Sequence, residues 1–214
     1  MQASPLGLQL STEESEKAAV QFVIIAPGNE HDSTESYQLE ITSKGIVVSA
    51  PSGAGLFYGF QTLLQLADAD TDGTYTLPLV DIKDAPRFAY RGLHQDVSRH
   101  FRTKEFIKKQ LDAMARYKLN TLHWHLTDGA GWRLEIKRYP ELTEQAAYRP
   151  YPNWKAWWKG GRKYCTKDAP GADGGYYTQD DAREIVEYAR QRHITVIPEI
   201  EMPGHSEEVL AVFP

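Results

Sequence analysis

Beyond Pro86, strand and helix patterns alternate in a fixed order, and this order constrains the fold more than any other feature of the chain. We expect strands at residues 91–97, 120–126 and 194–200, the first of them buried and the third, which is almost continuously apolar, covered on both faces. Thr103 is predicted to cap a helix after the first strand, and Thr178 with Asp181 forms a capping-box pattern before the third. Repeated strand–helix–strand units imply a parallel sheet, either doubly wound or closed into a barrel.

The first 85 or so residues have a different rhythm, with short strand patterns around one helix. Strands are predicted at residues 19–25, 37–42, 45–50 and 75–82, the second and third forming a hairpin. From Gly55 onward, apolar residues recur at helical spacing, so a helix should cover one face of this sheet. The polar residues 68–73 are expected to end the helix, and Asp84 with Pro86 marks a domain boundary.

Composition narrows the class of protein and of partner. The 214 residues are 41% hydrophobic and 25% charged, as in an ordinary globular protein. A net charge of -5 leaves no excess of positive charge for a phosphate backbone, so we expect no nucleic-acid partner. We also expect no membrane partner, because no apolar run approaches the roughly 20 residues that span a bilayer. Cys165 is the only cysteine, and residues 1–10 have no signal-peptide pattern.

Polar residues follow each of the three strands beyond Pro86. The carboxyl ends of parallel strands meet at one edge of a sheet, so three polar groups placed there predict one pocket. A lone histidine on a strand is more often a satisfied core residue, and only the set as a whole argues for a site. The set comprises Asp96, Ser98, Arg99, His100, His123, His125, Asp128, Glu199, Glu201 and His205.

Four separated blocks of sequence resemble the signatures of family 20 glycoside hydrolases, in the same order. The blocks lie within residues 91–101, 120–128, 174–178 and 198–205. Residues 54–66 and the strand after them also resemble the small domain that precedes the barrel in that family. The resemblance implies an α/β fold in which a small α+β N-terminal domain, residues 1–86, precedes an incomplete (β/α)8 TIM barrel. That barrel part, residues 87–214, would hold about three of eight units.

The resemblance also assigns roles to three residues. Arg99 matches an arginine that hydrogen-bonds hydroxyls of the terminal sugar, a task suited to the fixed fork of a guanidinium. Asp128 and His205 match a supporting catalytic pair, in which a carboxylate orients an imidazole next to the catalytic acid. The competing interpretations are a surface salt bridge for Arg99 and a helix cap for Asp128.

The activity implied by the resemblance is that of a β-N-acetylhexosaminidase, which removes terminal N-acetylglucosamine or N-acetylgalactosamine from glycans. The family mechanism is substrate-assisted and retaining, with the sugar's own acetamide as nucleophile. It uses an adjacent Asp–Glu pair as polarising group and general acid, and no Asp followed directly by Glu occurs in these 214 residues. We therefore expect a fragment that is weakly stable and inactive alone. No cofactor and no metal is implied, and the family suggests a secreted, periplasmic or lysosomal location.

The chain departs from the family pattern at three places. Gly129 and Ala130 stand where many members have Asp and Gln, and Glu201 stands where Asp is common. The loop at residues 148–171 is long and holds Trp154, Trp157 and Trp158. Those indoles could form an extra sugar subsite or close a small core under the loop.

Two other functions fit parts of the pattern. His123 and His125 lie on one face of a strand, as the ligands of a metal-dependent hydrolase would. Arg99 with the loop tryptophans would also suit a non-catalytic module that binds N-acetylglucosamine.

Overall fold

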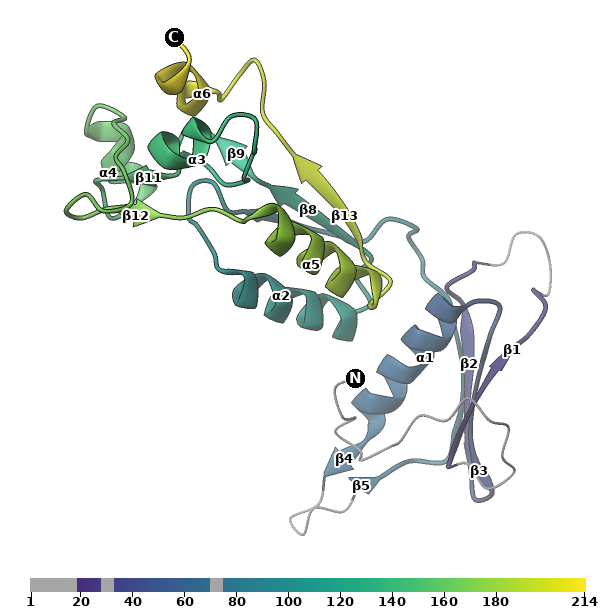
Figure 1. Ribbon diagram of the computed structural model, residues 1–214. Helices are drawn as coiled ribbons and strands as arrows, with labels where there is room; N and C mark the ends of the chain where they lie inside the picture. The colour runs from purple at the N-terminus through teal and green to yellow at the C-terminus, as the bar shows by residue number, and fades with distance from the viewer. Residues whose placement is uncertain (1–18, 28–32, 70–74) are drawn as a thin grey trace. The chain divides into compact units, whose positions relative to one another are not determined.

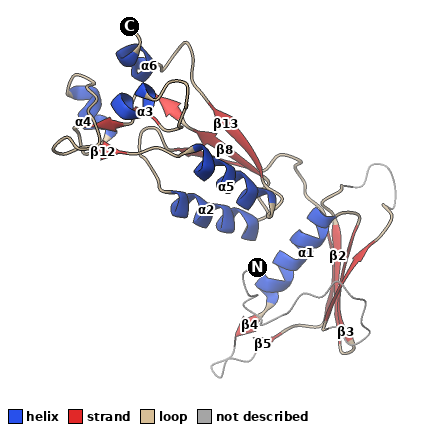
Figure 2. Cartoon of the chain, viewed as in Figure 1, coloured by secondary structure: helices blue, strands red, loops and turns tan. Residues whose placement is uncertain are grey.

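The computed structural model describes residues 19–27, 33–69 and 75–214. The chain divides into two compact units, Met1–Ala89 and Tyr90–Pro214, each with its own hydrophobic core. Both units combine helices with strands, as the α/β prediction requires (Figure 2). Within the described part of the chain, every helix is too short or too polar to cross a bilayer.

The first unit is a four-stranded sheet with one helix on a single face. The strand order is β1-β3-β2-β6, with β1 parallel to β3 and the other pairs antiparallel. The helix begins after Ser52, whose side chain accepts hydrogen bonds from the main-chain N–H groups of Ala54 and Gly55. The elements are β1 (Val20–Ile24), β2 (Tyr37–Thr42), β3 (Gly45–Ala50), α1 (Gly53–Leu66) and β6 (Val80–Asp84).

The single strand predicted at residues 75–82 is wrong. The structure has β5 (Tyr75–Thr76), paired with β4 (Asp68–Ala69), and then a separate strand β6 paired with β2. Pro78 lies between them, and proline has no N–H to donate to a ladder, so the chain leaves one sheet before it joins the other. The helix ends before the polar stretch as predicted, although residues 70–73 of that stretch lie outside the described residues.

The second unit is built on three parallel strands. The order is β13-β8-β7, with β7 at Gly92–Asp96, β8 at Thr121–His125 and β13 at Thr195–Glu199. Two helices, α2 (Lys104–Arg116) and α5 (Gln179–Arg190), lie side by side on one face of this sheet (Figure 1). The Thr103 cap and the capping box of Thr178 with Asp181 are both confirmed.

The rest of the second unit consists mainly of short elements that follow the carboxyl ends of these strands. They are β9 (Thr127–Asp128), β10 (Gly131–Trp132), α3 (Glu141–Ala146), β11 (Tyr148–Arg149), α4 (Trp154–Lys159), β12 (Asp173–Gly174) and α6 (Glu207–Val212). They form one hairpin (β9–β10), one antiparallel strand pair with a helix between its strands (β11–β12), and three one- or two-turn helices including that one.

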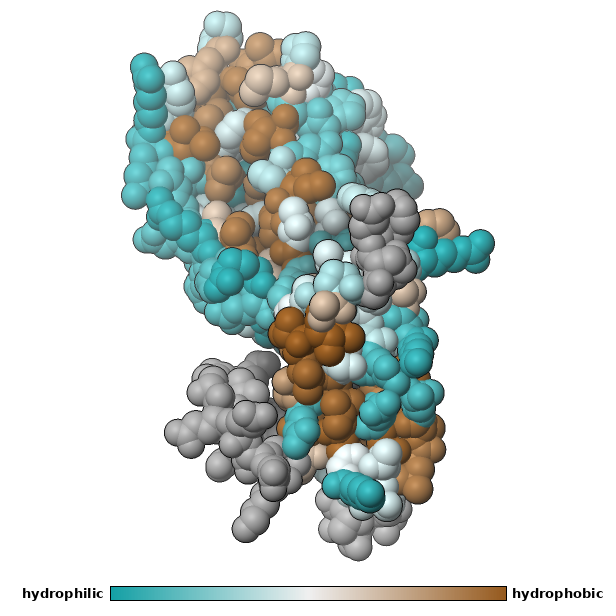
Figure 3. All heavy atoms as spheres, turned by 90° about the vertical axis from the view of Figure 1, so that its right-hand side faces the viewer, coloured by the Kyte–Doolittle hydropathy of each residue, from teal (hydrophilic) through white to brown (hydrophobic). Residues whose placement is uncertain are grey.

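Two expectations for the parallel strands are wrong. The strand at residues 91–97 is not buried, because every residue of β7 is partly or fully exposed, and the strand at residues 194–200 is not covered on both faces. β8 is in the middle of the sheet and mostly buried, whereas β13 is at an edge and leaves Ile197 42% exposed. The two helices cover one face only, so the apolar run in β13 has no layer over its other face. Figure 3 shows hydrophobic side chains interrupting the polar surface of both units.

The glycine at position 55 of α1 gives a stability test of the first unit. A Cβ there would lie 2.3 Å from the main-chain oxygen of Ser36 and 2.7 Å from Cβ of Ala50. Helix propensity alone favours Gly55→Ala by about 1 kcal/mol. Because the backbone of a packed sheet cannot yield easily, we expect the substitution to destabilise the unit by about 1–3 kcal/mol instead. Hydrogen exchange of the β3 amides measures this locally, and slower exchange in the variant would contradict the contact.

Candidate active site

Arg99, Asp128 and His205 meet although 106 positions of sequence separate the first from the last. Arg99 follows β7, Asp128 ends β9 after the central strand, and His205 follows β13. The Arg99 guanidinium Nη2 lies 2.6 Å from Asp128 Oδ2, and His205 Nδ1 lies 3.1 Å from the same oxygen. Adjacent parallel strands thus deliver the three side chains to one edge of the sheet.

Asp128 is the buried centre of this group and does not cap a helix. Its side chain is 7% exposed, and Oδ2 also lies 3.2 Å from His125 Nε2. A buried carboxylate is stabilised only when charges or hydrogen-bond donors surround it, and Arg99, His125 and His205 supply three such neighbours.

Asp96 fixes the direction of the Arg99 side chain. Its Oδ1 accepts hydrogen bonds from the main-chain N–H groups of Ser98 and Arg99, each 3.0 Å long, and its Oδ2 lies 2.9 Å from Arg99 Nη1. Arg99 therefore takes part in a salt bridge on each side, but its side chain is 29% exposed and remains accessible to a ligand. His100, by contrast, is exposed and contributes nothing to this group.

His125 links the group to Glu199 on the neighbouring strand. Its Nδ1 lies 2.5 Å from Glu199 Oε2, while its Nε2 faces Asp128. Burial opposes a charge on this ring, but the hydrogen bonds with Asp128 and Glu199 prevail and raise the pKa of His125 to about 9. The sequence placed His125 among the polar residues at the strand ends and gave it a role only in the alternative function, as a metal ligand beside His123. Its alternation with His123 was the available signal.

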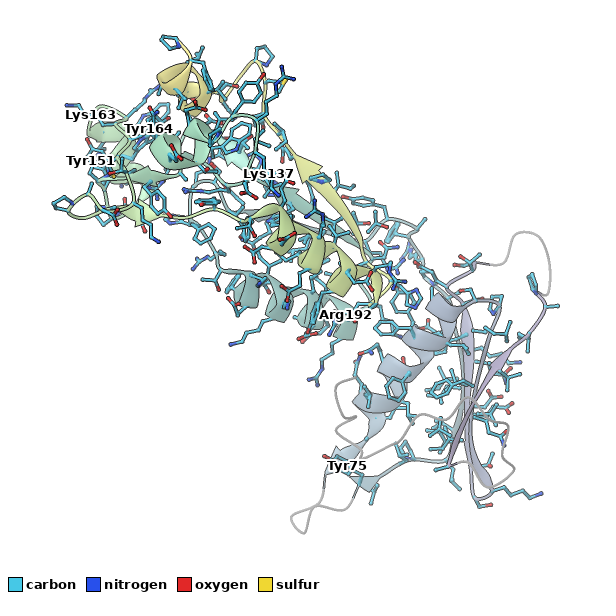
Figure 4. All side chains as sticks on the ribbon, in the orientation of Figure 1. Tyr75, Lys137, Tyr151, Lys163, Tyr164 and Arg192 are labelled. Carbon is cyan, nitrogen blue, oxygen red and sulfur yellow. The ribbon has the colours of Figure 1, made fainter. Side chains whose placement is uncertain are left out.

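The tryptophans of the long loop border the same site. A pocket of about 170 Å³ is lined by Arg99, Asp128, Gly129, Trp154, Trp157, Trp158, His205 and Glu207. Trp157 is 1% exposed and packs near Trp158 and Tyr164, whereas Trp154 and Trp158 are 37% and 48% exposed. One indole therefore serves as core under the loop and two present surface at the pocket. Tyr151 and Tyr164 lie in the same segment (Figure 4).

Glu207 fills the space beside Gly129, one of the positions at which the chain departs from the family pattern. A Cβ at this position would lie 2.3 Å from Glu207 Oε2 and 3.3 Å from the Trp157 ring. Glu207 is held there by Arg162, whose Nη1 lies 3.2 Å from Oε1. The carboxylate of Glu207 thus occupies the space beside position 129 that a longer side chain would take.

Two buried arginines that sequence reasoning missed hold the segments around the site. All five N–H groups of Arg133 donate to main-chain carbonyl oxygens, and the side chain is fully buried. Burial and the nearby charge of Arg149 lower the pKa of Arg133 to about 10, so it stays charged at neutral pH. The five acceptors belong to Val97, Ser98, Ala130, Ala147 and Gly175.

Arg149 is 1% exposed and acts on the site more directly. Its Nη2 donates to the main-chain oxygen of Arg99 over 2.7 Å, and its Nη1 donates to that of Ala130 over 3.4 Å. Asp173 supplies the counter-charge at 3.3 Å. The backbone on both sides of the Arg99–Asp128 pair is therefore fixed by buried guanidinium groups.

Replacing Arg133 tests whether its five hydrogen bonds hold these segments together. Arg133→Met keeps much of the side-chain volume but leaves five buried carbonyls without their donors. We expect a loss of about 3 kcal/mol or more in the free energy of unfolding. Arg183→Met on the exposed face of α5 is the matched control and should stay within about 0.5 kcal/mol. Urea unfolding followed by tryptophan fluorescence measures both, since all five tryptophans lie in the second unit. If Arg133→Met unfolds at the same urea concentration as the unaltered chain, the five carbonyls must find other donors.

Glu208 on α6 makes the stability of the second unit depend on pH. It is fully buried, and its carboxyl oxygens accept no hydrogen bond from any other described residue. Burial, with the nearby charges of Asp128 and Glu207, raises the pKa of Glu208 from 4.5 to about 8. The folded state therefore holds this proton more tightly than the unfolded state does. The resulting stability is complete below pH 4.5 and is lost as the pH rises to about 8.

We expect Glu208→Gln to remove this pH dependence, because the amide is neutral throughout. At pH 7 the ionisable side chain costs at most about 3 kcal/mol relative to pH 4.5, so the variant should be the more stable protein near neutrality. Urea unfolding at several pH values from 4.5 to 8 gives the slope of the free energy of unfolding against pH. Glu144→Gln, an exposed glutamate on α3 that is not among the charges acting on Glu208, should leave the slope as it is. If Glu208→Gln keeps the same pH dependence of stability, that dependence must come from other titrating groups.

Comparisons with known proteins agree with the sequence blocks. The description "Glycosyl hydrolase family 20, catalytic domain" matches residues 88–214, and "Glycosyl hydrolase family 20, domain 2" matches residues 3–85. A β-hexosaminidase of Porphyromonas gingivalis is 45% identical over 186 residues, which is 84% of this chain and 22% of that protein. A β-hexosaminidase of Vibrio vulnificus is 45% identical over 171 residues, 80% of this chain and 20% of its own length.

Solved structures give the same result for the fold. A family 20 exo-β-N-acetylglucosaminidase from Vibrio harveyi, in complex with N-acetylglucosamine, matches with a TM-score of 0.78 and 35% identity. The match covers 94% of this chain and 30% of that one. The chain thus spans about a fifth of each of the two curated relatives. The predicted resemblance is confirmed, and the chain belongs to glycosyl hydrolase family 20, the family of these β-hexosaminidases.

Proposed function

We propose that residues 87–214 form the sugar-holding part of a β-N-acetylhexosaminidase active site, within the first units of a TIM barrel that follows a small domain at residues 1–86. The reaction would remove a terminal non-reducing N-acetylhexosamine from a glycan. The observation that carries the proposal is the contact of Arg99 and His205 with one oxygen of Asp128 at the edge of an indole-walled pocket.

Arg99 is proposed to bind hydroxyl groups of the terminal sugar. Arg99 Nη1 contacts Asp96 and His125, and its Nη2 contacts Asp128, which leaves Nε–H and one N–H of Nη2 for a ligand. Because both carboxylates hold the guanidinium in place, little side-chain freedom is lost when a sugar binds. Trp154 and Trp158 offer partly exposed indole faces nearby, and such faces pack well against the apolar faces of sugar rings.

Asp128 and His205 are proposed as the supporting catalytic pair. The carboxylate lies 3.1 Å from His205 Nδ1, so it favours the tautomer with a proton on that nitrogen. The other ring nitrogen, Nε2, is then left to contact a neighbouring acid. The His205 side chain is 62% exposed, which leaves room for such a partner beside it.

The proposed chemistry is substrate-assisted and retaining, as in the family. The acetamido oxygen of the sugar would attack its own anomeric carbon, while an adjacent Asp–Glu pair polarises the acetamide and protonates the leaving oxygen. No such pair occurs among these 214 residues, and we infer that the chain does not hydrolyse glycosides alone. The second candidate function, an N-acetylglucosamine-binding fragment without turnover, is favoured by the same combination of a walled pocket and no general acid.

Sugar binding by the 214-residue chain tests the role of Arg99. N-acetylglucosamine should bind saturably, as measured by tryptophan fluorescence and by saturation-transfer NMR. Arg99→Ala should weaken binding about 10-fold or more, because hydrogen bonds from a charged group contribute about 1.5–3 kcal/mol. Arg99→Lys should recover only part of the loss, since an ammonium lacks the planar fork.

Arg183→Ala is the matched control, because this arginine lies on α5 with a side chain 67% exposed. It should bind the sugar as the unaltered chain does. Unchanged affinity in Arg99→Ala would contradict the assignment of Arg99. Release of the aryl group from an aryl N-acetylglucosaminide, measured in the same samples, should stay at background. Turnover by the chain alone would overturn the inference that it is inactive.

A further inference from the structure

We propose that His94, His123 and Glu199 form a binding site for a divalent transition metal, with zinc as the best match. The three residues lie on three adjacent parallel strands, β7, β8 and β13. This site shares no residue with the Arg99–Asp128–His205 group, although His125 contacts both, and it goes beyond the proposed glycosidase function.

The strand register places the three side chains on one face of the sheet. His94 is paired directly with His123, and Glu199 is paired with His125, two residues further along the same face. Leu93, Leu122 and Trp124 alternate with these positions and pack in the core against α2 and α5. The histidines and Glu199 therefore occupy the face that the helices leave uncovered.

The ligand atoms converge at distances that suit a tetrahedral ion. Glu199 Oε2 lies 2.8 Å from His123 Nε2 and 3.5 Å from His94 Nε2, and all three atoms lie within 4.8 Å of one another. With zinc–ligand bonds near 2.0–2.1 Å, the edges of a zinc tetrahedron are about 3.3 Å long. The separations of 2.8 Å and 3.5 Å bracket that value, so small rotations of exposed side chains would complete the geometry.

Hydrogen bonding alone accounts poorly for this arrangement. Three imidazole nitrogens, from His94, His123 and His125, surround the single oxygen Glu199 Oε2, which has two lone pairs. A metal ion between His94, His123 and Glu199 would replace two of these contacts with coordinate bonds. His125 Nδ1 would then remain as the donor that orients the ligating carboxylate, an arrangement common around metal sites.

The surroundings also favour this cluster over the neighbouring one. His125, Asp128 and Glu201 come close enough to bind a cation, but Arg99 already places its positive charge 2.6 Å from Asp128 Oδ2. No arginine or lysine is paired with Glu199 among the described residues. The side chains of His94 and His123 are 50% and 36% exposed, so an ion can enter and keep a water as its fourth ligand.

Metal titration of the tag-free 214-residue chain, stripped with a chelator, tests the site. Calorimetry with zinc chloride should give one saturable site per chain. Cobalt chloride should produce the intense visible absorption of tetrahedral Co²⁺. His94→Gln and Glu199→Gln should each weaken zinc binding at least 10-fold, whereas His100→Gln, an exposed histidine outside the cluster, should bind zinc as the unaltered chain does.

Far-UV circular dichroism of each variant checks the fold. If Glu199→Gln fails to fold, His94→Gln decides, because it changes a half-exposed side chain on an edge strand. Zinc should raise the thermal midpoint of the unaltered chain and of His100→Gln but not that of His94→Gln. The proposal is overturned if zinc does not bind saturably, or if His94→Gln binds it with unchanged affinity. Either result leaves the test of sugar binding by Arg99 unaffected.

Discussion

The buried guanidinium of Arg133 is the interaction on which the geometry of the candidate site depends. Its donors reach carbonyls after β7, in the β9–β10 turn, after α3 and after β12, so four stretches of irregular backbone meet on one side chain. Irregular backbone is hard to bury because its polar groups lack ladder partners. A planar cation with five donors solves this problem at one point, and Arg149 continues the arrangement to the main chain of Arg99.

Parallel register then divides the polar side chains of the sheet into two groups. Residues beyond the strand ends, such as Arg99 and His205, meet around Asp128. Residues within the strands, such as His94 and His123, lie next to each other on neighbouring strands and on one face of the sheet. His125 belongs to both groups, because its two ring nitrogens contact carboxylates of different groups. The charge state of this one ring therefore couples two regions that otherwise have separate partners.

The sequence predicted much of the fold because its signals were local. The Thr103 cap and the Thr178 capping box depend on residues three apart, and the strands of the parallel sheet depend on runs of five to seven residues. The ends of three such strands also pointed to the meeting of Arg99, Asp128 and His205. Arg133 and Glu208 could not be found this way. A buried charge has no sequence signature, since its burial is set by segments distant along the chain. The strand predicted at residues 75–82 was wrong for a different reason, because Pro78 interrupts residues that otherwise suit a ladder.

The complementary pair of Gly129 and Glu207 has a consequence for comparing this chain with its relatives. The two positions are 78 residues apart, yet they compete for the same volume, with the carboxylate of one filling the space left by the other. The residue at position 129 therefore restricts the conformations open to the side chain at position 207. A larger residue at position 129, brought in from a relative, would require the Glu207 side chain to turn away and give up its contact with Arg162.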